Sequence, residues 1–180
     1  GSHLQGHPDM LKTVGVDMTT GSLGQGLSAG LGMALGGRVK GLHFHVYVLL
    51  GDGEIQEGQV WEAAMAASKW RVTNLVAILD RNHLQNDERV ERIMPIEPVA
   101  GKWRAFGWQV REIDGHDMHQ IVETLEEVRD GATSPTLVLA NTIKGCGVSF
   151  MEGDPAWHGR APCKEEAERA LCELGGALDA

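Results

Sequence analysis

An aspartate between two glycines stands directly after an apolar run of the sequence. Asp52 lies in the segment GDGEIQEG at residues 51–58, and residues 42–50 (LHFHVYVLL) have the length and composition of a buried strand. A strand that ends there and continues as a helix places Asp52 at the carboxyl edge of a sheet, where open α/β folds bind ligands. Its carboxylate is a hard oxygen ligand, and the glycines let the amides of Gly53 and Glu54 approach a phosphate. Alone, however, this segment is also the sequence of an ordinary Asp-Gly turn.

A second polar residue follows the next predicted strand. Asn82 lies 82 − 52 = 30 residues after Asp52, and it comes just after the apolar run at residues 75–80. One helix and one strand account for this separation, so both side chains are expected at the same edge of neighbouring parallel strands. Aspartate and asparagine oxygens, with a backbone carbonyl, suit Mg²⁺ or Ca²⁺, and so few protein ligands leave positions for phosphate and water. The spacing favours a metal-held diphosphate site over two unrelated polar loop residues.

A glycine-rich segment precedes both motifs. Residues 22–35 have the pattern of a helix, with leucines at positions 23, 27, 31 and 35 on one stripe. Glycines at positions 24, 26, 30 and 32 each cost about 1 kcal/mol relative to alanine inside a helix, so a close backbone approach must compensate. One interpretation is tight helix packing. The other is an anion site at residues 19–26 (TTGSLGQG), where amides around Gly21 would face a phosphate.

These segments belong to a regular alternation of strands and helices. Further strands are predicted at residues 108–113 and 136–140, and further helices at 57–70, 95–106 and 119–130. Near-continuous apolar strands joined by helices favour right-handed crossovers and a mostly parallel sheet. We therefore predict a doubly wound α/β fold with helices on both faces. It forms one domain, residues 1–180, in which residues 150–180 pack as a tail on the domain edge.

Composition narrows the class of partner. The 180 residues carry a formal net charge of −9, and no run of lysine or arginine is present. A surface of this kind does not displace the counterions of nucleic acid, so a small molecule is the expected partner. No apolar stretch approaches the ~20 residues that span a bilayer, and the sequence shows no secretory signal, so no membrane association and a cytoplasmic location are expected.

Seven short segments, spread over nearly the whole sequence, agree with one known family. They are GHP (6–8), TTGSLGQGLS (19–28), GDGEIQEGQVWEAAM (51–65), KWRAFGW (102–108), DGHD (114–117), TIKGCG (142–147) and WHG (157–159). Because GDG followed about thirty residues later by asparagine is the thiamine diphosphate signature, the sequence resembles the pyrophosphate-binding domain of the transketolase family. A deoxyxylulose-phosphate synthase would share GDG and the asparagine, but it usually differs from QEG, WEAAM and WHG.

The resemblance implies a cofactor site. Thiamine diphosphate would be held through Mg²⁺ or Ca²⁺, with Asp52, Asn82 and the Leu84 carbonyl as metal ligands. The residues implied to contact the diphosphate are Gly53, Asn82, Lys144 and His158, and Leu23 is implied to pack on the thiazolium ring. Gly21 and Glu54 are also expected to bind the cofactor, through their backbone amides in the two loops.

The same resemblance implies catalytic roles for three residues. His7 resembles the histidine that faces substrate, and Glu57 resembles the glutamate that links paired active sites across a dimer interface. His158, implied at the diphosphate, is the third residue expected to be catalytic. Both histidines have structural alternatives as satisfied loop residues. Glu57 has one too, since the helix macrodipole favours a glutamate at a helix start.

Only the pyrophosphate half of a transketolase is expected here, truncated at its N-terminus. The pyrimidine-binding domain, whose glutamate activates the cofactor, and the C-terminal domain would come from a partner subunit. The resemblance then implies a split enzyme that transfers two-carbon ketol units between sugar phosphates, as in the pentose phosphate pathway. It is expected to assemble as a homodimer or larger and to be inactive without its partner. The alternatives are another thiamine enzyme, acting on different ketoses or aldehydes, and a non-catalytic binding module or remnant.

Overall fold

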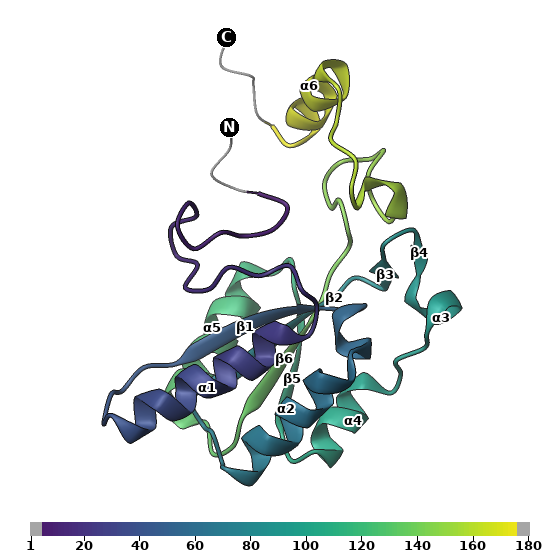
Figure 1. Ribbon diagram of the computed structural model, residues 1–180. Helices are drawn as coiled ribbons and strands as arrows, with labels where there is room; N and C mark the ends of the chain where they lie inside the picture. Colours follow the sequence, from purple (N-terminus) through teal and green to yellow (C-terminus); the bar gives the residue numbers. More distant parts are fainter. Residues whose placement is uncertain (1–4, 176–180) are drawn as a thin grey trace.

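A four-stranded parallel sheet forms the centre of the molecule (Figure 1). The computed structural model describes residues 5–175. Its strands are β1 (Val46–Gly51), β2 (Leu75–Arg81), β5 (Gln109–Asp114) and β6 (Thr136–Asn141), in the order β1-β2-β6-β5. The four expected strands are confirmed, but the first is shorter than predicted. It begins at Val46 because the register partner of Val46 is Leu75, the first residue of β2.

Helices cover both faces of this sheet, as predicted for a doubly wound fold. Figure 1 shows α1 (Gln25–Val39), α2 (Gly58–Lys69) and α4 (Val99–Ala105) in front of the sheet and α5 (Met118–Gly131) behind it. The strand order explains this division. The chain moves outward from β1 to β2 to β5 and then returns to place β6 between β2 and β5. Right-handed crossovers put the returning helix α5 on the opposite face.

The two faces are covered to different extents. The larger core lies under α1, α2 and α4 and includes Leu27, Leu50, Val60, Leu79, Trp103 and Leu137. A smaller cluster lies under α5, where Val76, Ile113, Val128 and Val138 are buried. This helix leaves the β1 side of its face open, because Leu49 on β1 is 70% exposed.

Packing on the sheet explains one glycine of α1, Gly30. A Cβ atom at Gly30 would lie 2.5 Å from Cγ2 of Val48, so the helix backbone sits directly on β1. This confirms tight packing at that position. The expected leucine stripe is confirmed at Leu27 and Leu31 but is wrong at Leu23, which is 54% exposed. The helix begins only at Gln25, after Gly24 in the left-handed conformation (φ 81°), so Leu23 lies ahead of it.

Short elements fill the connections. They are the 3-10 turns η1 (Glu54–Gln56) and η2 (Pro155–Trp157), the hairpin β3 (Leu84–Gln85) and β4 (Glu88–Arg89), and the helices α3 (Val90–Ile93) and α6 (Lys164–Glu173). The helix expected from residue 95 starts only at Val99, whose amide donates to Oε2 of Glu97. No helix within residues 5–175 is long and apolar enough to cross a membrane.

The segment after β6 extends beyond the carboxyl edge of the sheet and ends in α6 (Figure 1). Helix α6 buries none of its residues and is tied to the preceding loop, where the Ser149 hydroxyl donates to Glu173 and the Arg169 guanidinium lies over the ring of Phe150. The single domain with an edge-packed tail stays a prediction, and residues 176–180 of that tail lie outside the described part.

Candidate active site

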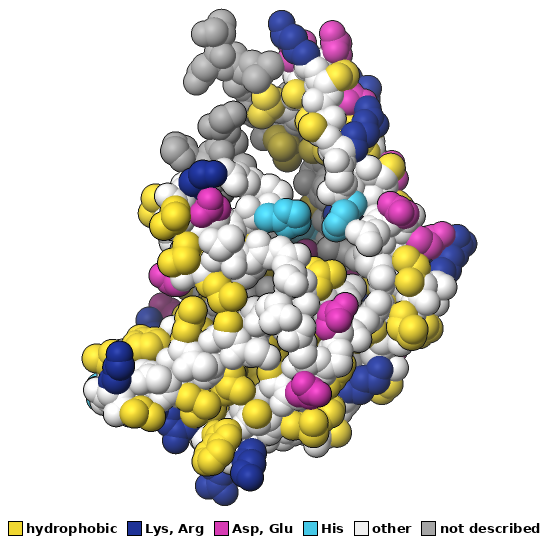
Figure 2. All heavy atoms as spheres, viewed as in Figure 1, with side chains coloured by type: hydrophobic (Ala, Val, Ile, Leu, Met, Phe, Trp, Pro, Cys, Tyr) yellow, Lys and Arg dark blue, Asp and Glu magenta, His cyan; other side chains and the backbone are white. Residues whose placement is uncertain are grey.

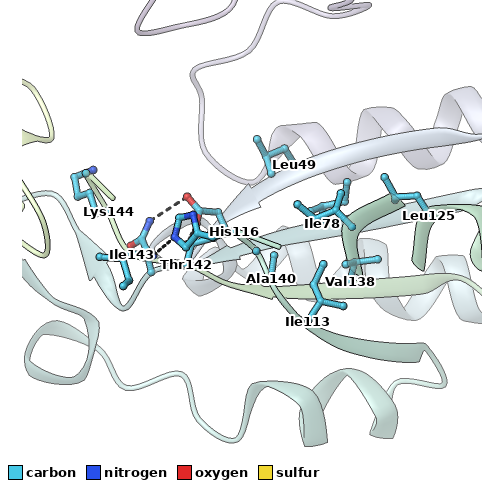
Figure 3. A pocket seen from close by; sticks show the side chains of 15 residues that line it. Leu49, Ile78, Ile113, His116, Leu125, Val138, Ala140, Thr142, Ile143 and Lys144 are labelled. Carbon is cyan, nitrogen blue, oxygen red and sulfur yellow. Dashed lines mark hydrogen bonds between the residues drawn. The ribbon is translucent and has the colours of Figure 1, made fainter. Parts of the chain in front are cut away.

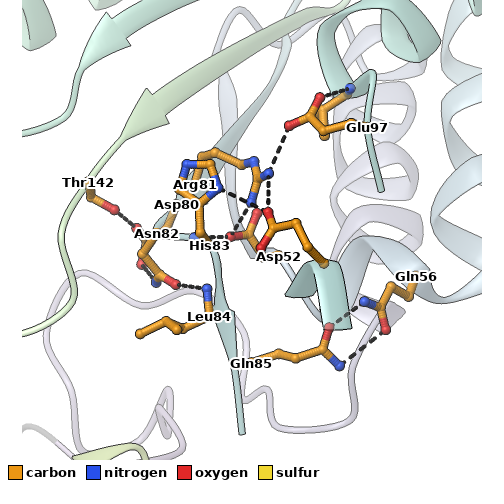
Figure 4. A network of polar contacts seen from close by, with 12 residues as sticks. Asp52, Gln56, Asp80, Arg81, Asn82, His83, Leu84, Gln85, Glu97 and Thr142 are labelled. Carbon is orange, nitrogen blue, oxygen red and sulfur yellow. Dashed lines mark hydrogen bonds and ion pairs between the residues drawn. The ribbon is translucent and has the colours of Figure 1, made fainter. Parts of the chain in front are cut away.

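The ends of β1 and β2 bring the two predicted metal-binding segments together. Gly51 pairs with Asp80 in the sheet, so the residues after them leave neighbouring strands at the carboxyl edge. The backbone amide of His83 donates to Oδ2 of Asp52 over 2.6 Å (Figure 4). The adjacency that the thirty-residue spacing predicts is therefore present, whereas the role of these residues in binding stays a proposal.

Asp52 is a buried carboxylate with one oxygen occupied and one free. The residue is 1% exposed, and its Oδ2 also accepts a hydrogen bond from Nη1 of Arg81 at 3.0 Å. Its Oδ1 is buried and has no hydrogen-bond partner among residues 5–175. Burial raises the pKa of the Asp52 carboxyl above its ordinary value, although the charge and hydrogen bond of Arg81 oppose this. A buried anionic oxygen without a donor is costly unless a cation or another ligand contacts it.

The arginine that holds Asp52 is not among the site residues predicted from the sequence. Arg81 is 2% exposed, and its Nη2 lies 2.8 Å from Oε1 of Glu97 and 3.3 Å from Oε1 of Glu91. Burial alone would lower the pKa of Arg81, but its bonds to Glu97 and Asp52 outweigh this and raise it. The sequence nevertheless contains a signal for this arginine. Strand alternation places Arg81 on the same face as Leu79, which the helices cover, and an arginine there requires carboxylates.

Asn82 opens a tight turn that leads into the hairpin. Its Oδ1 accepts from the amide of Leu84 at 2.9 Å, and its Nδ2 donates to Oδ2 of Asp80 at 3.0 Å. Asp80 is bonded in turn to the hydroxyl of Thr142 from the end of β6. His83 adopts a positive φ of 65°, which bends the backbone between Asn82 and Leu84. The turn thus fixes the Asn82 side chain against Asp80 and the Leu84 amide, while the next residue, His83, bonds to Asp52. Metal binding by the Leu84 carbonyl stays a proposal.

The glycine-rich segment lies against the GDG loop. The carboxylate of Glu54 accepts from the amide of Gly24 at 2.9 Å and from the amide of Gly51 at 3.3 Å, so this side chain joins the two segments. A Cβ atom at Gly53 would lie 3.0 Å from Cβ of Gln85, which leaves no room for a side chain. Whether the amides of Gly53 and Glu54 contact a phosphate stays a prediction.

His7 and Gly21 lie together on the N-terminal side of this loop. A Cβ atom at Gly21 would lie 3.1 Å from Cδ2 of His7, so the histidine ring covers the glycine. Leu23 projects outward nearby, and its carbonyl accepts a 3.4 Å bond from Nε2 of Gln59. Glu57 is exposed at the start of α2 and makes no side-chain capping bond there. The structure leaves both interpretations of Glu57 open.

A cavity of about 450 Å³ opens on the other side of the strand ends, beside α5. Figure 3 shows apolar side chains such as Ile78 and Val138 at one end and His116, Thr142 and Lys144 at the other. The Nε2 atom of His116 accepts a 2.8 Å bond from the amide of Ile143, which fixes the loop that carries Lys144. In the described part of the chain, the Lys144 ammonium makes no ion pair with a carboxylate. Sequence analysis left His116 unassigned, although it stands in the DGHD segment.

His158 lies on the segment that follows β6. It is exposed at the end of η2, and its neighbour Trp157 is fixed by a 3.0 Å bond from Nε1 to the carbonyl of Phe150. Within residues 5–175, His158 makes no hydrogen bond to Asp52 or Asn82. Figure 2 shows histidine side chains on both sides of a hollow on this face, between the N-terminal segment and the segment after β6.

The donor set constrains the kind of metal site. In the part of the chain that the structure describes, three or more His, Cys, Asp or Glu side chains do not gather around one point. A cation held wholly by such side chains is therefore not supported. One carboxylate, one amide oxygen and one carbonyl form an all-oxygen set that suits Mg²⁺ or Ca²⁺ only when ligand phosphates or water complete it.

Comparison with known proteins gives a consistent picture. Residues 1–177 match the family described as "Transketolase, thiamine diphosphate binding domain". The chain is 48% identical to the 6-deoxy-6-sulfo-D-fructose transketolase subunit of Clostridium sp. (strain MSTE9) over 97% of this chain and 63% of that protein. It is 41% identical to an apulose-4-phosphate transketolase subunit of Phocaeicola vulgatus, over 99% and 63%. The chain thus spans less than two thirds of the length of these relatives.

A longer relative and a solved structure are also similar to this chain. Human transketolase is 38% identical over 96% of this chain and 27% of its own length. The crystal structure of the transketolase of Campylobacter jejuni superposes with a TM-score of 0.89 and 30% identity, covering 99% of this chain and 29% of that chain.

Proposed function

Because the chain belongs to the transketolase family through its thiamine diphosphate-binding domain, we propose that it holds thiamine diphosphate through a divalent metal at the ends of β1 and β2. One observation carries this proposal. The Oδ1 atom of Asp52 is buried and unpartnered among the described residues, and it belongs to a carboxylate whose other oxygen is bonded to the turn that carries Asn82. A divalent cation at this oxygen would satisfy it, and the few protein ligands nearby would leave positions for the diphosphate.

Each residue has a role in this proposal. Asp52, Asn82 and the Leu84 carbonyl would hold Mg²⁺ or Ca²⁺. The bare backbone at Gly53 and the amide of Glu54 would face the diphosphate, and the ammonium of Lys144 would add a positive charge. The remaining proposed contacts are Gly21 and His158 near the diphosphate, Leu23 against the thiazolium ring and His7 toward the substrate.

The reaction requires more than this chain provides. When bound, thiamine diphosphate supplies a thiazolium carbon that adds to a ketose carbonyl. The residues of this chain would bind the diphosphate end and orient the ring. We propose that a partner subunit contributes the pyrimidine-binding part, as the names of the relatives suggest. The assembled enzyme would transfer two-carbon ketol units between sugar phosphates or similar anionic ketoses, and the isolated chain would be inactive.

Thermal unfolding with and without ligand tests cofactor binding. A ligand that binds only the folded state at about 100 times its Kd adds about 2.7 kcal/mol of stability. For a chain of this size, that corresponds to a rise in Tm of roughly 5–10 °C. We expect this rise with thiamine diphosphate and Mg²⁺ together and its loss when EDTA removes the metal.

Co-expression with the partner subunit, followed by a ketol-transfer assay, separates the remaining alternatives. Cofactor binding by the isolated chain and ketol transfer only by the complex would support the split enzyme. A folded chain that binds no cofactor, alone or in the complex, would contradict the proposal and favour a non-catalytic remnant. A complex that binds cofactor but is active only on other ketoses or aldehydes would favour a different thiamine enzyme.

A further inference from the structure

Arg81 is a charged side chain buried beside the proposed metal site. Its Nη1 atom contacts Oδ2 of Asp52 at 3.0 Å, and its Nη2 atom contacts Glu97 and Glu91 at 2.8 and 3.3 Å. Figure 4 shows the guanidinium between Asp52 on one side and Glu97 on the other. Burying an arginine costs several kcal/mol unless its donors are matched by carboxylates, and here Asp52, Glu91 and Glu97 supply them.

The contact determines which oxygen of Asp52 is available. Oδ2 accepts two hydrogen bonds, one from Arg81 and one from the His83 amide at 2.6 Å, whereas Oδ1 has no partner among the described residues. These two donors fix the rotation of the carboxylate. Oδ1 is therefore held in one position, and an incoming cation would not have to order the side chain itself.

The arginine also offsets repulsion at the site. Asp52, Glu91 and Glu97 bring three negative charges to one guanidinium, so the group carries a net charge of −3 + 1 = −2. Without the guanidinium, the charge of Asp52 would remain buried with only the His83 amide to balance it. A divalent cation could partly replace that missing charge, but Asp52 would then be free to turn.

The guanidinium is itself anchored from two separate elements. Glu97 accepts from Arg81 through Oε1 and from the first amide of α4, at Val99, through Oε2 over 2.7 Å. Glu91 on α3 contacts both Arg81 and Nδ1 of His83, the latter over 3.2 Å. These contacts link the starts of α3 and α4 to the metal-binding turn.

We propose that Arg81 is a positioning residue for the metal: it locks Asp52 so that Oδ1 alone faces the cation that holds the diphosphate. This inference rests on the proposed function. It predicts a change in metal affinity that is separate from cofactor affinity, because Arg81 contacts a metal ligand and not the cofactor.

The test compares the parent chain with Arg81→Met and Arg81→Lys. Each protein is titrated with Mg²⁺ at a fixed concentration of thiamine diphosphate, and binding is measured by calorimetry and by the rise in Tm. Loss of a group that orients a metal ligand typically lowers metal affinity about 10- to 100-fold. We expect Arg81→Met to raise the half-saturating Mg²⁺ concentration by that factor, with cofactor affinity restored at saturating Mg²⁺. Arg81→Lys should give a half-saturating Mg²⁺ concentration between those of the parent chain and Arg81→Met, because one ammonium cannot bridge Asp52 and Glu97 as a guanidinium does.

Two further variants make the result decisive. Arg104→Met removes an exposed arginine whose Nη2 lies 2.8 Å from Glu112, and it should leave the Mg²⁺ dependence unchanged. If Arg81→Met does not fold, Glu97→Gln removes the charge that anchors the guanidinium and so loosens its hold on Asp52, and it should shift the Mg²⁺ dependence in the same direction by a smaller factor.

The outcomes separate this inference from the proposed function. A parent chain that shows no Mg²⁺-dependent cofactor binding overturns both. A parent chain that binds, with an unchanged Mg²⁺ midpoint in the folded Arg81 variants or in Glu97→Gln, overturns the positioning role alone. Equal loss of cofactor affinity at all Mg²⁺ concentrations would also overturn it, since a merely structural role gives that result.

Discussion

The Nη1 atom of Arg81 lies 3.0 Å from Oδ2 of Asp52, and both side chains are almost completely buried. Asp52 is therefore not a surface ligand on an open loop, although it follows a strand and is flanked by glycines. Its carboxylate is part of the core charge balance as well as of the proposed site. Substitutions at Asp52 must consequently be judged on stability and on binding separately.

The Asp52→Ala variant is expected to be less stable than the parent chain and to lose metal-dependent cofactor binding. It leaves Arg81 with only the two exposed glutamates, and breaking a buried ion pair costs about 3–5 kcal/mol. Asp52→Asn keeps an acceptor for the His83 amide and should cost less. Urea unfolding measures the difference in stability, and Tm with and without thiamine diphosphate and Mg²⁺ measures binding. Asparagine keeps an oxygen that can bind a cation, so the binding test uses Asp52→Ala under conditions where it stays folded. A ligand-induced rise in Tm that survives in that variant would move the metal site elsewhere.

Two glycines of α1 provide a matched test of packing. A Cβ atom at Gly30 would lie 2.5 Å from Val48, whereas one at Gly32 would meet nothing within 4 Å. Gly32→Ala should stabilise by about 0.5–1 kcal/mol, because alanine is the better helix former. Gly30→Ala gains the same propensity but should be net destabilising, since overpacking typically costs about 1–3 kcal/mol. Equal midpoints of urea unfolding for the two variants would contradict the packing of α1 on β1.

Much of the fold could be predicted because it depends on local patterns. Apolar strands alternating with helices specify a parallel sheet, and the length of one strand-helix-strand unit places Asp52 and the turn at Asn82 side by side. The predicted helix and strand boundaries are wrong where a neighbouring strand or a backbone conformation sets the end of the element. β1 begins where β2 begins, and Leu23 leaves the helix because Gly24 takes a left-handed conformation.

The polar network was beyond these patterns. Glu91 and Glu97 lie 10 and 16 residues after Arg81, and they return to it only because the hairpin and α3 fold the chain back. No periodicity encodes that path. The position of His158 is similar, since it depends on a long segment with little regular structure between β6 and α6. Local rules give the strand ends, whereas the supporting contacts depend on tertiary structure.

The glutamates around Arg81 predict a pH dependence of stability. A hydrogen bond from its own backbone amide, then those from His83 and Arg81, lower the pKa of Glu91 to about 2 from 4.5, and hydrogen bonds from Arg81 and Val99 lower the pKa of Glu97. A lowered pKa stabilises the folded state above pH 4.5, and this contribution disappears as the pH falls from 4.5 toward 2. Both side chains are about half exposed, so screening keeps the effect modest.

Glu91→Gln should therefore flatten the loss of stability between pH 5 and about 2, the range set by the lowered pKa. Glu62→Gln, on the exposed side of α2, serves as the control and should keep the slope of the parent chain. Midpoints of urea unfolding, measured across this pH range for the three proteins, test the prediction. Parallel curves for the parent and Glu91→Gln would show that the ion pairs of Glu91 contribute nothing measurable to acid stability.

The chain is also predicted to self-associate. The small residues Ala63, Ala64 and Ala67 of α2 are buried in the chain's own core, so they are not open to a second copy. Met65 on α2 and Trp70 at its end are exposed apolar side chains, with exposed fractions of 52% and 56%. Exposed apolar groups of this size favour association when they form a continuous patch.

Light scattering on the purified chain measures its oligomeric state. We expect a dimer or a larger species at ~100 μM, because an interface of ordinary size has a Kd well below that concentration. Met65→Lys should shift the equilibrium toward monomer, since it replaces an exposed apolar side chain of α2 with a charged one. Val122→Lys, which alters an exposed apolar residue on α5 behind the sheet, should not. A parent chain that is strictly monomeric at ~100 μM contradicts self-association, and equal effects of the two lysine variants would place the interface elsewhere.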